Sequence, residues 1–224
     1  MKTILIAGAN RGIGREFVRQ LATSDWTVHA TARDARGLEA LSGTCEAVHR
    51  LDITDDDSIA SLAAELKGVA FDAVFANAGI SGDVTLPIEA IDYDEMFRVF
   101  NTNTFGPLRL IAALKANLMA GEKRLALGMS SLMSSISSND WGTQHCYRAS
   151  KTALNATWRS LSQEWRPDGI SCVLLRPGFV KTDMTNNQGM DVETSVAGMI
   201  SVIETLGLAD SGRVIGYDGK DVAW

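Results

Sequence analysis

Short apolar runs alternate along the chain with longer stretches in which apolar residues recur every three or four positions. The short runs predict strands at residues 3–7, 26–32, 46–50, 72–76, 123–129, 170–175 and 213–216. The longer stretches predict helices near residues 12–23, 55–66, 92–102, 104–119, 148–165 and 192–206. Asp55, and Asp92 with Glu95 three residues later, are typical of helix N-caps.

The order of these elements predicts the fold class. Several predicted strands are apolar at nearly every position, as expected of a sheet that helices cover on both faces. Strand and helix alternate from end to end, which favours an α/β fold: a doubly wound, Rossmann-type parallel sheet of about seven strands with right-handed crossovers. The 224 residues contain no low-complexity linker and no repeat, so we expect a single domain over residues 1–224.

The composition argues against several kinds of partner, namely nucleic acid, a membrane and a metal ion. Lys and Arg number 21 against 27 Asp and Glu, a net charge of −6, and no basic cluster is long enough for a nucleic-acid or anionic-membrane surface. No apolar stretch approaches the roughly 20 residues that cross a bilayer. The cysteines are odd in number and scattered, which fits a reducing compartment, so we expect a cytoplasmic protein. The histidines do not form a metal set, and we expect no metal: they are His29, His49 and His145.

A glycine-rich turn directly follows the first predicted strand. It reads Gly8-Ala9-Asn10-Arg11-Gly12-Ile13-Gly14, a GxxxGxG spacing that opens the first helix. Glycines there let a pyrophosphate approach the backbone, and the helix N-terminus attracts the anion. A plain strand-to-helix turn is the alternative, but the position within a βαβ unit favours dinucleotide binding.

Two further segments follow predicted strands, at the edge where open α/β sheets bind ligands. They are Leu51-Asp52-Ile53-Thr54 and Ala76-Asn77-Ala78-Gly79. Taken alone, Asp52 is equally typical of a helix cap, and residues 77–79 of an ordinary turn.

Tyr147 and Lys151 are four residues apart at the start of a predicted helix, so their side chains share a face. Lys151 occupies a position where the periodic pattern places an apolar residue. A nearby ammonium favours a phenolate, which predicts a lowered pKa for Tyr147 and a role as general acid or base. A lysine that extends its ammonium to solvent is the alternative. Serines crowd the preceding segment, and one hydroxyl there can hold a substrate oxygen beside the phenol.

Together these residues resemble the short-chain dehydrogenase/reductase family, over essentially the whole chain. The order and spacing of the matching motifs make the resemblance specific: GxxxGxG, Asp52, Asn-Ala-Gly at 77–79, Asn103, YxxxK at Tyr147 and Lys151, and Pro177-Gly178 followed by Thr182. Within the family, the chain is similar to the small C-factor and sniffer-type carbonyl reductases, which share Asn-Arg-Gly-Ile-Gly and a short tail ending in Trp.

The resemblance implies a role for each matched position. Tyr147 would exchange a proton with the substrate oxygen, while Lys151 would lower its pKa and bind the nicotinamide ribose. Asn103 would hold a water that completes the proton path. The implied cofactor-binding residues of the glycine-rich turn are Gly8, Asn10, Arg11, Gly12, Ile13 and Gly14. Asp52 and Ile53 would flank adenine, and Asn77, Ala78 and Gly79 would lie on the adenosine ribose side. Val180 and Thr182 would contact the nicotinamide amide, and Pro177, Gly178, Tyr147 and Lys151 complete the set.

The catalytic serine is open between two positions. Ser131 ends the fifth predicted strand and matches by context, whereas Ser134 has the commoner family separation from the tyrosine. We prefer Ser131, because residues 134–140 resemble a lengthened loop. Ala7 departs from the usual threonine and removes a hydroxyl that ties neighbouring sheet segments.

The residues at the end of the second predicted strand indicate which of the two nicotinamide cofactors binds. A carboxylate there binds a ribose diol, and an arginine binds a 2′-phosphate. Here Arg33 stands at that point and Arg11 can face the same group, while Asp34 can cap a short following helix. We therefore predict NADP(H) over NAD(H).

Two functions remain at this stage. The first is an NAD(P)(H)-dependent oxidoreductase that acts on a small-molecule carbonyl or alcohol, most simply a carbonyl reductase. The second is a dinucleotide-binding regulatory or signalling protein of C-factor type, and the full Ser, Tyr, Lys and Asn set favours the first. We also expect a homo-oligomer, a dimer or tetramer, that pairs the helices near 104–119 and 148–165.

Overall fold

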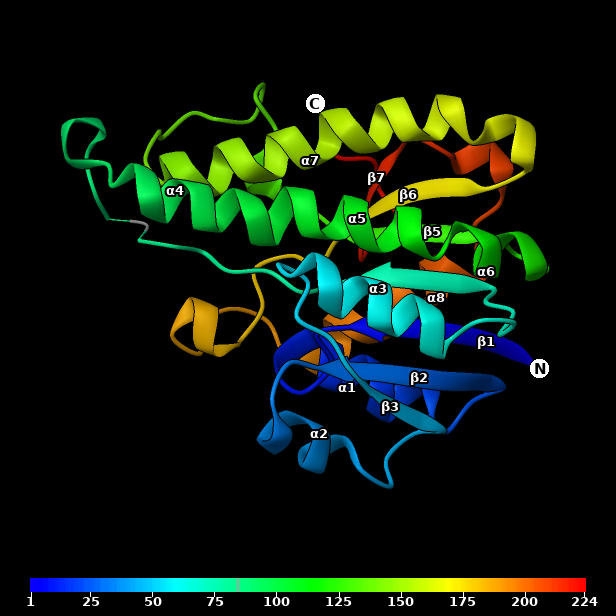
Figure 1. Cartoon of the computed structure of the whole chain (residues 1–224). Coiled ribbons are helices and arrows are strands. Elements are labelled where there is room, and N and C mark those ends of the chain that lie inside the picture. Colours follow the sequence, from blue (N-terminus) through cyan, green and yellow to red (C-terminus); the bar gives the residue numbers. More distant parts are fainter. Residues whose placement is uncertain (84) are drawn as a thin grey trace.

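The computed structural model describes residues 1–83 and 85–224 (Figure 1). Its strands are β1 (Lys2–Ala7), β2 (Trp26–Ala32), β3 (Ala47–Arg50), β4 (Ala73–Ala76), β5 (Leu125–Met129), β6 (Ser171–Arg176) and β7 (Val214–Gly216). Its α-helices are α1 (Gly12–Leu21), α2 (Ala35–Leu41), α3 (Asp56–Glu65), α4 (Tyr93–Phe100), α5 (Gly106–Ala113), α6 (Lys115–Ala120), α7 (His145–Glu164) and α8 (Val192–Thr205). The end of each predicted strand lies within two residues of its observed end.

The strands of the described residues form one seven-stranded sheet in the order β3-β2-β1-β4-β5-β6-β7. Every neighbouring pair is parallel, which confirms the predicted doubly wound sheet. The chain moves outward in one direction from β1 to β3 and in the other from β4 to β7. The switch point therefore lies between β1 and β4, where Ala7 pairs with Ala76, and ligands of such sheets bind at that crevice.

Helices cover both faces of the sheet. On one face α1, α2 and α8 enclose an apolar cluster that contains Phe17, Leu41 and Met199. On the other face α3, α5, α6 and α7 enclose a second cluster that contains Leu110 and Trp158. Figure 1 shows α7 running beside α4 and α5 across this second layer. Among the described residues, no helix has both the length and the apolar character that a bilayer span requires.

The helical region after residue 91 is more broken than predicted. The sequence predicts helices at 92–102 and 104–119, whereas α4 passes into a π-helical turn, η2 (Asn101–Phe105), before α5 and α6. Gly106 explains part of the difference, because a Cβ there would lie 2.5 Å from the carbonyl oxygen of Ile53. Pro107 follows in the first turn of α5, where it has no backbone N–H to donate.

Carboxylates begin several helices as the sequence predicts. Asp55 accepts from the backbone N–H groups of residues 57 and 58, and Asp92 accepts from those of residues 94 and 95. Helix α2 was predicted only as the short helix that Asp34 can cap, and Asp34 accepts from the N–H of Gly37 at 2.8 Å. Helix α7 begins three residues earlier than its predicted start at 148.

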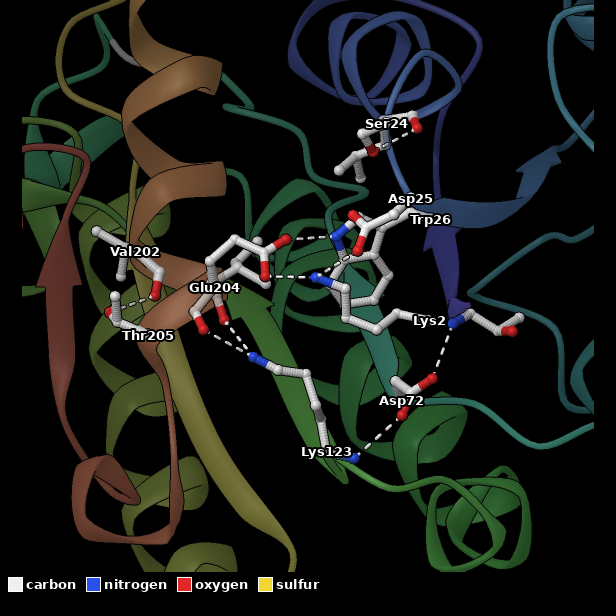
Figure 2. Close-up of polar contacts among 12 residues, drawn as sticks. Lys2, Ser24, Asp25, Trp26, Asp72, Lys123, Val202, Glu204 and Thr205 are labelled. Atoms are coloured by element: carbon white, nitrogen blue, oxygen red, sulfur yellow. Dashed lines mark hydrogen bonds and ion pairs between the residues drawn. The ribbon is translucent and has the colours of Figure 1, made fainter.

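Charged side chains join the strands at the amino edge of the sheet, opposite the crevice (Figure 2). Asp72 accepts from the N–H of Thr3, at 2.8 Å, and from the N–H groups of Glu122 and Lys123, each at 3.0 Å. Glu204 at the end of α8 accepts from Lys2 Nζ and from the indole of Trp26, both at 2.6 Å. These contacts hold the starts of β1, β2, β4 and β5 together.

Candidate functional site

The glycine-rich turn lies at the switch point, between β1 and α1. Gly8 has φ +74°, a left-handed conformation that favours glycine. A Cβ on Gly14 would lie 2.3 Å from the carbonyl oxygen of Gly8, so only glycine fits there. Asn10 packs on α2, since a Cβ on Gly37 would lie 3.0 Å from its Nδ2. Ile13 packs on the core beneath, which gives it a structural task.

Neighbouring strands fix this turn. The Asn77 side chain, beyond β4, donates from Nδ2 to the Gly8 carbonyl oxygen at 2.9 Å. Ala78 lies against Gly8, because a Cβ on Gly8 would come within 2.9 Å of the Ala78 Cα. Thr31 on β2 accepts from the Gly8 N–H at 3.2 Å. A hydroxyl from β2 therefore ties the segments that lack a threonine at Ala7.

Positive charge gathers where β2 and β3 end. Arg33 is exposed at the end of β2, and Arg50 is exposed at the end of β3. Both lie near Asp52: burial acts to raise the pKa of that carboxyl, but hydrogen bonds from Thr54 and the two guanidinium charges hold it below its usual value. The neighbouring carboxylate, Asp34, is already engaged as the cap of α2.

Tyr147 lies in the first turn of α7 beside Ser131, which directly follows β5. Burial raises the pKa of Tyr147, and hydrogen bonding with the Ser131 hydroxyl only partly opposes that rise. The prediction of a lowered phenol pKa is therefore wrong for the chain as it stands. The reason is burial, which outweighs the hydrogen bond with Ser131; the Lys151 Nζ lies 5.8 Å from the centre of the tyrosine ring.

Lys151 is nearly inaccessible, with 3% of its surface exposed. Its Nζ donates to the Met129 carbonyl oxygen at 2.8 Å, at the end of β5. Burial lowers its pKa to about 8. The ammonium thus lies within the site and does not extend to solvent, which excludes the alternative of a surface lysine.

The two candidate serines have different surroundings. Ser134 is buried and donates to the Ser131 carbonyl oxygen at 2.6 Å. It also accepts from Asn155 Nδ2 at 2.8 Å and from Ser130 Oγ at 3.1 Å. Its hydroxyl therefore has three partners within the protein. The Ser131 hydroxyl accepts only from the Met133 N–H, at 3.1 Å, among the described residues, and its hydrogen bonding acts to lower the pKa of Tyr147.

Asn103 lies in the π-helical turn η2, with no exposed surface. Its side chain accepts from the Ile80 N–H at 2.9 Å and donates to the Ile80 carbonyl oxygen at 2.8 Å and to Ser150 Oγ at 3.0 Å. Gly79 lies between this side chain and Lys151, since a Cβ on Gly79 would be 3.3 Å from Asn103 Oδ1 and 3.5 Å from Lys151 Nζ. Such π-turns are frequent at functional sites.

The segment after β6 crosses back over the glycine-rich turn. Pro177 accepts from Ser195 Oγ at 2.6 Å, and Gly178 takes φ +86° against Tyr217. Val180 is buried and pairs with Met190. Thr182 then approaches Gly12, where a Cβ would lie 3.5 Å from the Thr182 methyl carbon.

Arg11 faces this crossing segment. Its Nη1 lies 3.5 Å from a carboxylate oxygen of Asp183, and both side chains are exposed. The sequence predicts that Arg11 faces a 2′-phosphate beside Arg33, whereas in the structure its partner is the Asp183 carboxylate. A surface pair at this distance is weak, so Arg11 is available to another anion.

Most of the site residues that the sequence predicts lie at the carboxyl edge of the sheet. The structure adds two residues that the sequence did not predict. Arg50 was missed, although its position at the end of a predicted strand is the signal that singled out Arg33. Arg148, beside Tyr147, was also missed, because an arginine in an amphipathic helix gives no sign of being buried. Ile53 is buried beside Gly106 at the edge of the crevice.

Comparisons with known proteins agree with this geometry. The family described as short chain dehydrogenase matches residues 2–193. The C-signal protein of Myxococcus xanthus is 40% identical over 154 residues, which cover 68% of this chain and 92% of that protein. The NADPH-bound carbonyl reductase from chicken fatty liver has a TM-score of 0.91 and 34% identity, covering 100% of this chain and 99% of that one. The Drosophila melanogaster carbonyl reductase Sniffer has a TM-score of 0.90 and 33% identity, with 100% of both chains covered.

These matches extend over the elements that build the site. The glycine-rich turn, the Tyr147 and Lys151 helix and the switch point all fall within the matched residues. The chain belongs to the short-chain dehydrogenase/reductase family, and it is a nicotinamide-dependent oxidoreductase.

Proposed function

We propose that this protein is an NADPH-dependent carbonyl reductase in which Tyr147 donates the proton. One observation carries the proposal: Tyr147 in the first turn of α7, Ser131 directly after β5 and the buried Lys151 ammonium at the Met129 carbonyl oxygen come together at the carboxyl edge of the sheet. A general acid must be protonated at the working pH and must lie within hydrogen-bond reach of the reacting oxygen. The similarity to two carbonyl reductases supports the same reaction.

The residues present fit a dinucleotide with a 2′-phosphate. Gly8 and Gly14 let the turn pack closely against Ala78 and Asn77, where a Cβ would clash. The turn leads into the N-terminus of α1, and helix N-termini attract phosphate. Arg33 and Arg50 offer two guanidinium groups at the strand ends, and guanidinium groups bind phosphate well. Asp34, which would otherwise accept from a ribose diol, is occupied by the Gly37 N–H.

Ser131, Tyr147, Lys151 and Asn103 each have a separate role in the reaction. When bound, the nicotinamide supplies the hydride. Ser131 donates a hydrogen bond to the substrate carbonyl oxygen, and Tyr147 transfers its proton to that oxygen. Lys151, with its ammonium held by Met129, stabilises the negative charge that Tyr147 acquires. Asn103 fixes the segment at Ile80 and brings Gly79 beside Lys151.

A regulatory role is the second candidate, because the C-signal protein is similar to this chain. Such a protein needs the dinucleotide-binding turn but no acid catalyst. The complete set of Ser131, Tyr147 and Lys151 favours turnover. We further propose that the protein works in the cytoplasm on small molecules.

The test is NADPH oxidation by purified protein over aldehydes, ketones, diketones and quinones. We expect at least one carbonyl compound to be reduced, and NADPH to bind more tightly than NADH in calorimetry. Arg33→Ala should weaken NADPH binding and leave NADH binding unchanged, since only NADPH carries the 2′-phosphate. Equal affinities in the wild type would contradict the cofactor assignment.

Tyr147→Phe is the control for mechanism, since it keeps the ring and removes the acid. Turnover should fall on the order of 10²–10⁴-fold while NADPH affinity stays within a few-fold. Lys151→Met should lose both turnover and NADPH affinity. Wild-type protein that binds NADPH but reduces no carbonyl compound would favour the regulatory role.

A further inference from the structure

The segment that leads into α7 has an unusual backbone. Gly142, Thr143 and Gln144 have φ angles of 65°, 59° and 55°, three left-handed residues in succession. A β-branched residue such as threonine rarely takes this conformation, and strained backbone of this kind clusters at functional sites. Helix α7 begins at the next residue, and Tyr147 lies in its first turn.

Arg148 holds all three of these residues. Its Nε donates to the carbonyl oxygens of Gly142 at 3.2 Å and of Thr143 at 3.1 Å. Its backbone N–H donates to the carbonyl oxygen of Gln144 at 2.9 Å. Because one side chain binds successive carbonyl groups, it stabilises a conformation that the residues would not otherwise keep.

The same guanidinium lies against Trp141, with its central carbon 4.4 Å from the centre of the indole ring. This distance is within the range of a cation–π contact. The tryptophan side of the contact remains open, with 49% of Trp141 exposed. Arg148 thus fixes both the strained turn and the aromatic ring that precedes it.

Burial makes Arg148 costly in purely structural terms. Only 7% of its surface is exposed, and burial lowers its pKa. Its two terminal nitrogens, Nη1 and Nη2, have no hydrogen-bond partner among the residues the structure describes. An apolar side chain would fill this space without the penalty of burying a cation, so a role in holding the turn and the ring explains its presence better than packing does.

Exposed apolar side chains gather on the two segments that leave the catalytic edge. Ile136 and Trp141 lie on the segment after β5, while Phe179 and Met184 lie on the segment after β6. These segments carry or adjoin Ser131 and the cofactor-facing residues. A large exposed aromatic ring at such an edge offers a flat surface to a flat ligand.

We propose that Arg148 is a positioning residue that fixes Trp141 at the site entrance, where the indole packs against the apolar part of a flat aromatic carbonyl substrate. The inference rests on the proposed function, because it assumes that a carbonyl compound reacts at Tyr147. Trp141 then determines specificity by contact with substrate, and Arg148 acts through Trp141. Small aliphatic carbonyl compounds do not reach the indole and do not use this contact.

The test compares NADPH-dependent reduction of benzaldehyde and propanal by wild type, Arg148→Met, Arg148→Lys and Trp141→Ala. Arg148→Met and Trp141→Ala should each raise KM for benzaldehyde on the order of tenfold, with kcat within about threefold. KM for propanal should stay unchanged, and Arg148→Lys should fall between wild type and Arg148→Met. The double variant should be no worse than Trp141→Ala, since the two residues act in series.

Arg159→Met is the matched control, because Arg159 is an exposed arginine on the same helix; it should leave both KM values unchanged. Equal increases in KM for both aldehydes, or additive effects in the double variant, would overturn the inference while leaving the reductase assignment intact. Wild type that reduces neither aldehyde, nor any other carbonyl compound, would count against the proposed function itself.

Amide hydrogen exchange tests the Arg148 contacts without turnover. Arg148→Met should speed exchange across residues 141–147, and Arg159→Met should not. Unchanged exchange in Arg148→Met would overturn the positioning role, whatever the activity of the protein.

Discussion

At the scale of single residues, the two titrating groups of the site differ in the pH range where they change charge. Burial holds Tyr147 protonated beyond its usual range and brings the pKa of Lys151 down to about 8. As pH rises, the lysine therefore loses its proton first. The acid catalyst remains competent while the charge that supports it disappears.

This order predicts the pH profile of carbonyl reduction. The kcat/KM of the carbonyl substrate should be level at neutral pH and should fall as pH rises through about 8, where Lys151 becomes neutral. Steady-state rates across the range measure it. The control Lys115→Met, whose ammonium pairs with Asp168 away from the site, should keep the same break. A profile that stays flat well above pH 8 would show that the ammonium is dispensable.

The serine pair gives a second prediction at this scale. Ser131→Ala removes the hydroxyl that meets the substrate oxygen and should lower kcat on the order of 10²-fold, with little change in NADPH affinity. Ser134→Ala breaks contacts to Asn155 and Ser131 and should lower the unfolding free energy by about 1 kcal/mol while keeping most of the turnover. Kinetics and thermal unfolding of both variants decide between them, and a crippled Ser134→Ala with an active Ser131→Ala would reverse the assignment.

The sequence predicts which residues form the site better than it predicts their pKa values or their burial. Tyr147, Lys151 and Ser131 lie together at the carboxyl edge because motif spacing places them there, and their catalytic roles stay predictions. The pKa of Tyr147 was predicted in the wrong direction, because desolvation depends on packing that no local motif records. Arg148 was missed for the same reason: its burial comes from the residues 141–144 that fold over it.

At the scale of elements, the strand and helix order was predictable because fully apolar strands and amphipathic helices have distinct periods. The π-turn at η2 and the break before α6 were not. The π-turn directly precedes Gly106, whose close approach to Ile53 is a contact between residues far apart in sequence. Helix α2 is too short to show a clear period, and its cap Asp34 is the main sequence signal for it.

The contacts of Asp72 between strand starts predict how much this residue contributes to stability. It accepts three backbone N–H groups from the starts of β1 and β5, so Asp72→Ala should lower the unfolding free energy by about 3 kcal/mol. Asp72→Asn keeps one acceptor oxygen and should lose less. Denaturant unfolding measures both variants, and the kcat of the folded Asp72→Asn protein should match wild type, since the residue lies on the far edge from Tyr147. A loss of kcat with unchanged stability would contradict this.

At the scale of the whole molecule, the helical layer that contains α7 has one side packed on the sheet and one side exposed to solvent. Trp158 and Trp165 face the core, with 1% and 4% of their surfaces exposed. Tyr93, Phe97 and Phe105 along α4 and η2 remain exposed. This apolar row beside α7 supports the predicted pairing of two copies through this layer.

We therefore expect a dimer or larger assembly in solution. Sedimentation velocity at micromolar concentration should give a boundary at least twice the monomer mass, and Phe97→Asp should shift it toward the monomer by placing a charge in the apolar row. A single monomer boundary for the wild type would rule out the pairing.

The contacts at the amino edge of the sheet have a consequence for how this fold can be redesigned. Asp72, Lys2 and Glu204 secure the strand starts without help from the opposite edge. We therefore expect that exposed positions of the two segments that leave the opposite edge, such as Trp141 and Met184, can be varied to change the substrates accepted at little cost in stability. A library confined to such positions samples new substrates on an unchanged frame, whereas fusing bulky sequence at Lys2 disturbs the frame itself.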